Sequence, residues 1–312
     1  MIQRILFAAS THARLCLLLG LAGGLLLPAV AGALVPWLPH MVAGLLTITA
    51  LRIGWRAAMG AVGDLRWGLS AVLLLQMGVP LASLGIMTLA GFGDSPATLA
   101  IVLASAAPAI AGSVNLALIL GLDGGRMMQI FVLGTAAFPL TVLPVLAALP
   151  QLGPVTDVVF AALRLLVIIA VSAGAGFVLR RLFFPRPSQD QIKALDGLSV
   201  IAFSSIVVGL MAALNPALRA DPVAVLWWAL LAFAISYLLQ LFTLLALRHG
   251  KLKAVAGPIA IGAGNRNIAI FLVALPAEVL APLMVFIGCW QLPMYLTPVL
   301  LPRLYKWALG DE

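Results

Sequence analysis

The chain has 312 residues, of which 63% are hydrophobic and only 9% are charged. Soluble domains carry about 25% charged residues, so this composition excludes an ordinary soluble protein and indicates a polytopic membrane protein. The formal net charge of +8 could attract a nucleic acid, but the basic residues are scattered over short loops and form no single face. We therefore expect the lipid bilayer as a partner and no nucleic acid.

Ten apolar segments are long enough to cross a membrane, for which a helix needs about 20 residues. In chain order they cover residues 15–34, 36–51, 67–91, 97–121, 127–149, 158–179, 195–214, 223–247, 254–275 and 279–301. The sequence therefore predicts an all-α polytopic membrane protein with ten transmembrane helices.

The first span has a competing interpretation. MIQR precedes an apolar run that ends in PAVAGA at residues 28–33, and this order resembles a signal peptide with a small-residue cleavage site. Cleavage would remove a span that the repeat described below requires, so we expect the segment to be retained. Cys16 and Cys289 lie in different predicted spans and indicate no disulfide framework.

The loops between the spans differ in charge on alternate sides. One side holds Arg4, Arg14, Arg52, Arg56, Arg66, Arg126, Arg180, Arg181, Arg186, Lys193, Arg248, Lys251, Lys253, Arg303 and Lys306. The loops on the other side hold only Arg219, while Arg164 and Arg266 lie within spans. Because Lys and Arg accumulate in cytoplasmic loops, we expect both termini to be cytoplasmic. The short loops favour a bacterial inner membrane.

An internal repeat relates the fourth span to the ninth. AGSVNLALIL at residues 111–120 aligns without a gap to AGNRNIAIFL at 263–272, at a constant offset of 152. A similar offset relates the third span to the eighth and, more loosely, the first to the sixth. We predict two five-helix repeats, residues 1–150 and 151–312. Since five is odd, the second repeat is inverted in the membrane, as in many secondary transporters.

The matching spans combine helix-breaking residues with polar ones. The predicted helix breaks are Pro108, Gly112, Pro258, Gly262 and Gly264, because proline removes a backbone donor and glycine relaxes the helix. The predicted polar site residues are Ser113, Asn115, Asn265, Arg266 and Asn267. Close helix packing explains the glycines equally well, but unpaired polar groups cost several kcal/mol in hydrocarbon. Interrupted helices in the two halves of a transporter meet near the midplane and bind solute there.

Three motifs carry a resemblance to a known family: LLQMGVP at 74–80, APAIAGSVN at 107–115 and AIGAGNRNIA at 260–269. In these motifs, in span number and in repeat plan, the chain resembles the bile acid:sodium symporter family, within the wider group of bile, arsenite, riboflavin and auxin-type transporters. The resemblance implies a panel of helices 1, 2, 6 and 7 and a core of helices 3, 4, 5, 8, 9 and 10. The broken helices 4 and 9 would cross within that core beside the substrate. Gln76 and Ser113 match the family's residues at this crossover.

The sequence departs from the family where sodium would bind. Gly262 stands where the family has its sodium-binding glutamate, Arg266 replaces a glutamine ligand, and Asn115 is displaced by one position, with Val114 in its place. All ten acids fall in loops, at span ends or at the terminus: Asp64, Asp94, Asp123, Asp157, Asp190, Asp196, Asp221, Glu278, Asp311 and Glu312. No carboxylate remains in mid-membrane to neutralise sodium or relay a proton. We therefore expect no cofactor or metal, and weak or absent sodium coupling.

Arg266 admits three interpretations. Its guanidinium, which is always charged in proteins, could take the electrostatic role of a bound sodium ion, held by Gln76, Asn115, Asn265, Asn267 and backbone carbonyls. It could instead bind an anionic substrate bidentately. It could also be a structural brace that ties broken-helix carbonyls together. The first two interpretations favour an anionic organic solute.

The predicted function is a secondary transporter of small organic anions that works by alternating access. An arsenite carrier is disfavoured because the resemblance would call for a cysteine in the fourth span. The alternative is an integral membrane enzyme or sensor. Membrane enzymes cluster carboxylates, Ser/His pairs or metal ligands, and no predicted span contains such a cluster. We thus expect a transporter and no enzyme, and the sequence predicts no oligomeric state.

Overall fold

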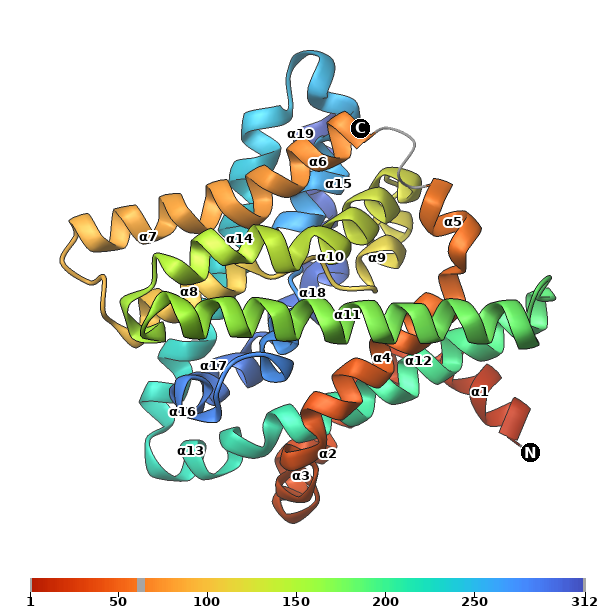
Figure 1. Ribbon diagram of the computed structural model, residues 1–312, viewed down its shortest axis with the longest axis horizontal. Coiled ribbons are helices and arrows are strands. Elements are labelled where there is room, and N and C mark those ends of the chain that lie inside the picture. Colours follow the sequence, from red (N-terminus) through yellow and green to blue (C-terminus); the bar gives the residue numbers. More distant parts are fainter. Residues whose placement is uncertain (1, 61–64, 311–312) are drawn as a thin grey trace. The chain divides into compact units, whose positions relative to one another are not determined.

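The computed structural model describes residues 2–60 and 65–310 of the chain (Figure 1). Among the ten acids, Asp64, Asp311 and Glu312 lie outside the described residues. Within them the protein consists of helices and their connections, and no β-strand is present apart from one isolated bridge between Ala109 and Arg266. The all-α prediction is confirmed.

The helices follow one another with short connections. The α-helices are α1 (Ile2–Thr11), α2 (Ala13–Leu26), α3 (Pro28–Leu34), α4 (Leu38–Ile53), α5 (Trp55–Gly60), α6 (Leu65–Leu73), α7 (Val79–Leu89), α8 (Pro96–Ala106), α9 (Ser113–Ile119), α10 (Gly124–Ala147), α11 (Val155–Phe183), α12 (Gln189–Leu210), α13 (Leu214–Ala220), α14 (Pro222–Leu247), α15 (Lys253–Gly264), α16 (Ala277–Leu280), α17 (Met284–Cys289), α18 (Gln291–Leu300) and α19 (Pro302–Leu309). Short 3-10 or π turns join several of them: η1 (Val35–Trp37), η2 (Leu74–Gly78), η3 (Pro150–Leu152), η4 (Met211–Ala213), η5 (Gly250–Leu252), η6 (Ile268–Val273) and η7 (Ala281–Leu283).

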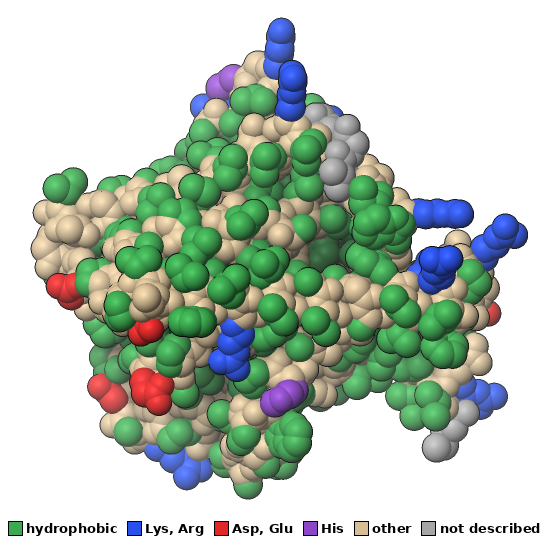
Figure 2. Space-filling model, viewed as in Figure 1, with side chains coloured by type: hydrophobic (Ala, Val, Ile, Leu, Met, Phe, Trp, Pro, Cys, Tyr) green, Lys and Arg blue, Asp and Glu red, His purple; other side chains and the backbone are tan. Residues whose placement is uncertain are grey.

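Long apolar helices make this an integral membrane protein. Seven helices in the described part of the chain are long and apolar enough to cross a bilayer, and an eighth follows if α1 and α2, which bend by 94°, count as one span. Figure 2 shows apolar side chains spread over the visible surface and few charged ones among them. Two predicted spans, 97–121 and 254–275, are the interrupted helices α8–α9 and α15–η6. A total of ten spans therefore stays a prediction.

The predicted boundary between the first two spans, at residues 34–36, is wrong. Leu27 leaves the helical conformation, with φ −118° and ψ 65°, and a helical segment then runs from Pro28 to Ile53. The residue before a proline is disfavoured in the helical region, and this explains the break at Leu27. Pro36 interrupts nothing because it lies in the 3-10 turn η1 at the first positions, where no backbone donor is needed.

The chain divides into two compact units, each formed from three segments. Unit 1 contains residues 1–58, 164–226 and 272–289. Its long helix α12 packs against α1, α2 and α4. Glycines allow these close approaches: a Cβ at Gly197 would overlap the Leu6 carbonyl, and a Cβ at Gly20 would lie 2.8 Å from the Ser204 carbonyl oxygen. Such small-residue packing is how membrane helices come together without a hydrophobic driving force.

Unit 2 contains residues 59–163, 227–271 and 290–312. Helix α10 is its centre and packs against α6, η2, α9 and α15. Phe138 of α10 and Phe271 stack edge to face at 5.5 Å in the interior. Both interrupted helices lie largely in this unit, which therefore holds the candidate site. The predicted division into repeats at residue 150 stays a prediction.

Candidate functional site

The first interruption follows α8 at Ala106. Ala107 has φ −55° and ψ 149°, an extended conformation that suits the residue before a proline, here Pro108. Six residues, 107–112, then separate α8 from α9, which begins at Ser113 after Gly112. The local sequence thus ends the helix deep in an apolar segment, where its free backbone groups need new partners.

The second interruption begins later than predicted. Helix α15 runs through Pro258 and Gly262 and ends at Gly264, so neither of those two residues breaks it. Pro258 is only the sixth residue of the helix, and its missing donor leaves one carbonyl to satisfy. Gly262 is a packing residue, since a Cβ there would lie 3.2 Å from Ile130. The break starts at Asn265, with φ −110° and ψ 81°, whose carboxamide Nδ2 donates to the Ile261 carbonyl at 3.1 Å.

The two interruptions pair with each other through their backbones. Ala109 and Arg266 form an antiparallel bridge. The Ile110 amide donates to the Asn265 carbonyl at 3.0 Å, and the Asn267 amide donates to the Pro108 carbonyl at 2.8 Å. Each break therefore satisfies polar groups that the other exposes, which is the condition for non-helical backbone at membrane depth.

Arg266 lies in the interior of unit 2 and is 1% exposed. Its guanidinium makes three hydrogen bonds, all to backbone carbonyls. Nε donates to Ala263, Nη1 to Ala107 and Nη2 to Leu75, each at 3.0 Å. The three carbonyls belong to three separate segments: the end of α15, the end of α8 and the turn η2. One side chain thus joins three interrupted stretches of helix.

Each of these carbonyls lacks its usual helical donor. In a continuous helix the Asn267 amide would donate to Ala263, but it donates to Pro108 instead. At η2 the Val79 amide donates five residues back to Leu74; the next donor in this register would be residue 80, and Pro80 has no N–H. The third carbonyl, on Ala107, follows the last residue of α8. The Arg266 guanidinium supplies the hydrogen-bond donors that the backbone does not.

The electrostatics of this position favour a cation. Helices α8 and α15 both end here, and the C-terminal end of a helix carries about half a negative elementary charge. No carboxylate pairs with the guanidinium: the one ion pair found among residues 2–60 and 65–310 joins Arg52 to Asp196, both in unit 1. Backbone carbonyls therefore hold the guanidinium without a carboxylate partner among the described residues.

The side-chain amides do not hold Arg266 as predicted. Gln76, buried in η2, donates from Nε2 to the Gly134 carbonyl at 3.0 Å and accepts from the Thr141 hydroxyl at 2.7 Å. Both of its polar groups are thus engaged with α10. Asn265 is buried and accepts from the Thr297 hydroxyl at 3.3 Å. The guanidinium is bonded to the carbonyls freed by the helix breaks. The side-chain amides of Gln76 and Asn265 are bonded to other residues instead.

The remaining predicted site residues differ in environment. Ser113 is buried, and its hydroxyl has no hydrogen-bond partner among the described residues. Asn115 is exposed on α9, and Asn267 is partly exposed. In the part of the chain that the structure describes, neither carboxamide is hydrogen-bonded. These two amides are free to meet a solute, whereas Arg266 is not.

Several contributors were missed from the sequence. Trp290 is buried, and its Nε1 donates to the Arg266 carbonyl at 2.9 Å. A second chain of bonds reaches the end of α15 from α19: the Tyr305 hydroxyl donates to Gln240 at 2.8 Å, and the Ser236 hydroxyl donates to the Gly264 carbonyl at 2.9 Å. Gln240 links the two because its Nε2 donates to the Ser236 hydroxyl oxygen at 3.4 Å. The sequence signals for these residues were a tryptophan far from a span end and Gln240, a polar residue within an apolar span.

Comparisons with protein families and with curated protein sequences find no match to this chain.

Proposed function

We propose that the protein is a secondary transporter of small organic anions in which the Arg266 guanidinium occupies the place of a coupling cation. The observation that carries this proposal is the set of three backbone carbonyls, on Leu75, Ala107 and Ala263, that bind the guanidinium at 3.0 Å. Carbonyl oxygens freed by broken helices are typical ligands of sodium in secondary transporters. Here a side chain of the protein satisfies them.

The proposal joins this geometry to the resemblance to bile acid:sodium symporters. In it the ten predicted spans form two inverted repeats, and the interrupted helices are counterparts at their crossover. Inverted repeats with broken helices are the usual plan of transporters that work by alternating access. The membrane would be a bacterial inner membrane with both chain termini in the cytoplasm. No observation among the described residues favours the alternative, a membrane enzyme or sensor.

The nature of the substrate follows from the charge. Arg266 adds a positive charge that no described carboxylate neutralises, and such a field attracts anions to nearby polar groups. Direct binding to the guanidinium is disfavoured because the side chain is 1% exposed and is engaged with carbonyls. Asn115 and Asn267, which are accessible and unpaired in the described structure, are the better candidates for contact with the solute.

Uptake into proteoliposomes tests the proposal. Wild type, Arg266→Gln and the control Arg164→Gln are compared with a panel of radiolabelled organic anions, with and without an inward sodium gradient. Arg164 is the other arginine within a predicted span, but it is exposed on α11. We expect wild-type uptake to ignore sodium. The Arg266→Gln variant should show no uptake, or uptake that depends on sodium. Uptake by the Arg164→Gln variant should remain independent of sodium.

Two results would contradict the proposal. If the wild type concentrates substrate on a sodium gradient, a sodium site exists elsewhere and the guanidinium does not replace the ion. If no organic anion of any size is taken up by folded wild-type protein, the transport assignment itself is wrong.

A further inference from the structure

Helix α1 lies close to the plane of the membrane. It bends by 94° from α2, and α2 runs beside α12 in the same direction, since a Cβ at Gly20 would meet Ser204 and one at Gly24 would meet Val208. Helix α12 belongs to the apolar segment Gln189–Ala220, which is long enough to cross the bilayer. A helix at nearly a right angle to this direction extends along the membrane surface and not through the membrane.

The level of α1 in the membrane follows from its contact with α12. Leu6 approaches Gly197 so closely that a Cβ there would overlap the Leu6 carbonyl, and α1 lies beside this N-terminal part of α12 (Figure 1). The predicted apolar span of α12 begins two residues earlier, at residue 195. At a rise of about 1.5 Å per residue, the contact lies about 3 Å inside the span. Helix α1 is therefore at the boundary between hydrocarbon and headgroups.

Two opposite sides of α1 can be assigned from its position on α12. Lys193 lies in the first turns of α12, before the apolar span begins, and its ammonium is 5.4 Å from the centre of the Phe7 ring. Phe7 therefore faces away from the hydrocarbon, and so does Arg4, one turn before it. Ile2 and Ile5 lie about 140–160° around the helix from Phe7, and they are 73% and 52% exposed. These exposed isoleucines are on the hydrocarbon side of α1.

The side of α1 that faces away from the hydrocarbon carries positive charge. Arg4 and Lys193 are both exposed, and neither forms an ion pair in the described parts of the chain. Their side chains are neighbours, because both lie next to Phe7. Of the two acids on this part of α12, Asp196 is held in the ion pair of unit 1, and Asp190 has no cation within ion-pair distance among the described residues. Two neighbouring cations thus lie on the headgroup side of a helix whose other exposed side is apolar.

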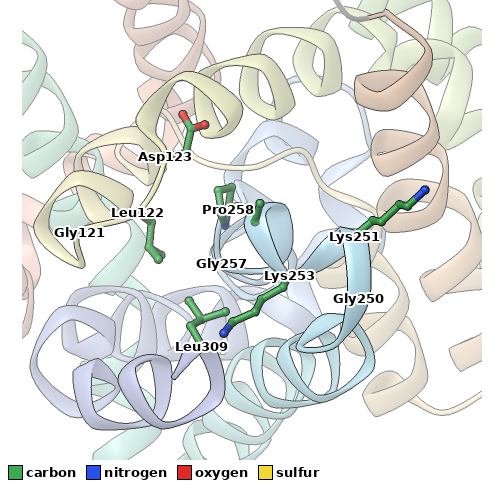
Figure 3. A pocket seen from close by; sticks show the side chains of 10 residues that line it. Gly121, Leu122, Asp123, Gly250, Lys251, Lys253, Gly257, Pro258 and Leu309 are labelled. Atoms are coloured by element: carbon green, nitrogen blue, oxygen red, sulfur yellow. The ribbon is translucent and has the colours of Figure 1, made fainter. Parts of the chain in front are cut away.

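The cavity at the start of α15 in unit 2 does not have this arrangement. Its volume is about 460 Å³, and Asp123, Lys251 and Lys253 are among its lining residues. Figure 3 shows the Lys251 ammonium directed away from it, which leaves the Lys253 ammonium facing the Asp123 carboxylate. One cation opposite a carboxylate does not select an anion. This cavity therefore lacks the excess of positive charge that α1 has.

We propose that α1 binds anionic phospholipid headgroups through Arg4 and Lys193 while Ile2 and Ile5 enter the hydrocarbon. Helices with an apolar side and flanking basic residues lie in the interface of a bilayer in this way, and anionic lipids strengthen their binding. A soluble anion would meet the same two cations but would leave the isoleucines in contact with water. Lipid binding by α1 needs only the membrane placement of unit 1 and no transport activity, so the two proposals can fail separately.

Nitroxide labels on the full chain in lipid nanodiscs test how α1 lies. In a Cys16→Ala/Cys289→Ala background, one variant carries the label at Ile5→Cys and the other at Thr11→Cys, an exposed position one turn from Phe7. We expect the label at position 5 to be more accessible to oxygen, which concentrates in hydrocarbon. The label at position 11 should be more accessible to a water-soluble nickel reagent. Equal accessibility at the two positions would overturn this orientation of α1.

Native mass spectrometry of the full chain in a neutral detergent tests which lipid binds. Binding of phosphatidylglycerol and of phosphatidylcholine is compared for wild type, for Arg4→Gln/Lys193→Gln and for the control Arg56→Gln/Arg181→Gln. The control removes the same charge from exposed residues of α5 and α11 in unit 1. Because two basic residues near a headgroup are removed, phosphatidylglycerol should bind the Arg4→Gln/Lys193→Gln variant about 30-fold more weakly than wild type. The control should bind as wild type does.

Two results would overturn lipid binding by α1. They are equal affinity of wild type for the two lipids, and equal loss of phosphatidylglycerol binding in the two double variants. Arg4→Lys/Lys193→Arg keeps both charges and should retain binding. In lipid-free detergent all of these double variants should melt within about 2 °C of wild type, because the substituted side chains are exposed. A loss of lipid binding then does not reflect unfolding.

Discussion

Replacing Arg266 with methionine tests whether the guanidinium holds the interrupted helices together. Methionine is long and apolar, so the substitution removes the donors and the charge while much of the buried volume stays filled. It leaves the carbonyls of Leu75, Ala107 and Ala263 without the donor that each has in the structure. Nothing in the helices can replace those donors, since Pro80 has no N–H and the Asn267 amide is bonded elsewhere.

The expected loss of stability can be worked from these three bonds. A hydrogen bond to a charged group contributes about 1.5–3 kcal/mol, so the three together contribute about 5–9 kcal/mol. Removing the arginine recovers about 3 kcal/mol that a central arginine costs on insertion scales. A net loss of about 2–6 kcal/mol remains. At about 2–4 °C per kcal/mol for proteins of this size, the melting temperature should fall by on the order of 10 °C.

Thermal unfolding of purified protein in detergent, followed by tryptophan fluorescence, measures this shift. Trp290 reports directly, because its indole donates to the Arg266 carbonyl. Arg266→Lys should melt between wild type and Arg266→Met, since one ammonium group cannot reach three carbonyls in the planar arrangement of a guanidinium. The control Arg164→Met, on an exposed position of α11, should melt within about 2 °C of wild type. An Arg266→Met protein as stable as this control would refute the reasoning.

Four further substitutions, one of them a control, test packing and hydrogen bonding in the two units. Gly264→Ala should lower the melting temperature by about 5 °C, because the added Cβ would overlap the backbone of α14. The control Gly112→Ala should leave the melting temperature unchanged, since its Cβ would meet only one side-chain carbon, at 3.6 Å. Tyr305→Phe should cost about 1–3 kcal/mol by leaving Gln240 without its donor. Burial raises the pKa of the Tyr305 phenol well above its usual value. Above about pH 10 the phenol ionises in the unfolded chain only, so the free energy of unfolding of the wild type should fall as the pH rises. The phenylalanine variant should lose less stability in the same unfolding series. Gly197→Ala should force α1 away from α12 and speed hydrogen exchange in α1; unchanged exchange would mean that this glycine is not needed for contact.

The membrane-helix class was predictable because it depends on composition and segment length alone. Most predicted spans coincide with helices in the structure to within a few residues, since hydrocarbon thickness sets their length. The boundary at Leu27 was not predictable in the same way. Both Pro28 and Pro36 can end a helix, and only the conformation of the preceding residue decides between them.

The candidate site shows the same division between pattern and geometry. Arg266 stood out because a charge inside an apolar run is costly, and the helix break near Pro108 followed from proline chemistry. Of the predicted ligands of the guanidinium, the backbone carbonyls are found and the side-chain amides are not. Backbone carbonyls leave no mark in a sequence unless a missing donor reveals them. Pro80 is such a missing donor, but at the sequence level it was used only as part of a motif. Its effect on the Leu75 carbonyl depends on the π turn, in which the Val79 amide donates to the Leu74 carbonyl.

A tethered cation has a thermodynamic consequence for transport, which rests on the proposed function. A sodium ion can leave its carbonyls on either side of a membrane and so deliver the energy of its gradient. The Arg266 guanidinium cannot leave, so it contributes binding energy to the fold and no driving force to the cycle. In proteoliposomes held at zero membrane potential, any transported anion should equilibrate and never accumulate above its external concentration. Preloading the vesicles with unlabelled anion should accelerate entry of the labelled one by exchange. Accumulation against a gradient at zero potential, with neither sodium nor proton gradient imposed, would require a further coupled ion and would remove the reason for placing an arginine among those three carbonyls.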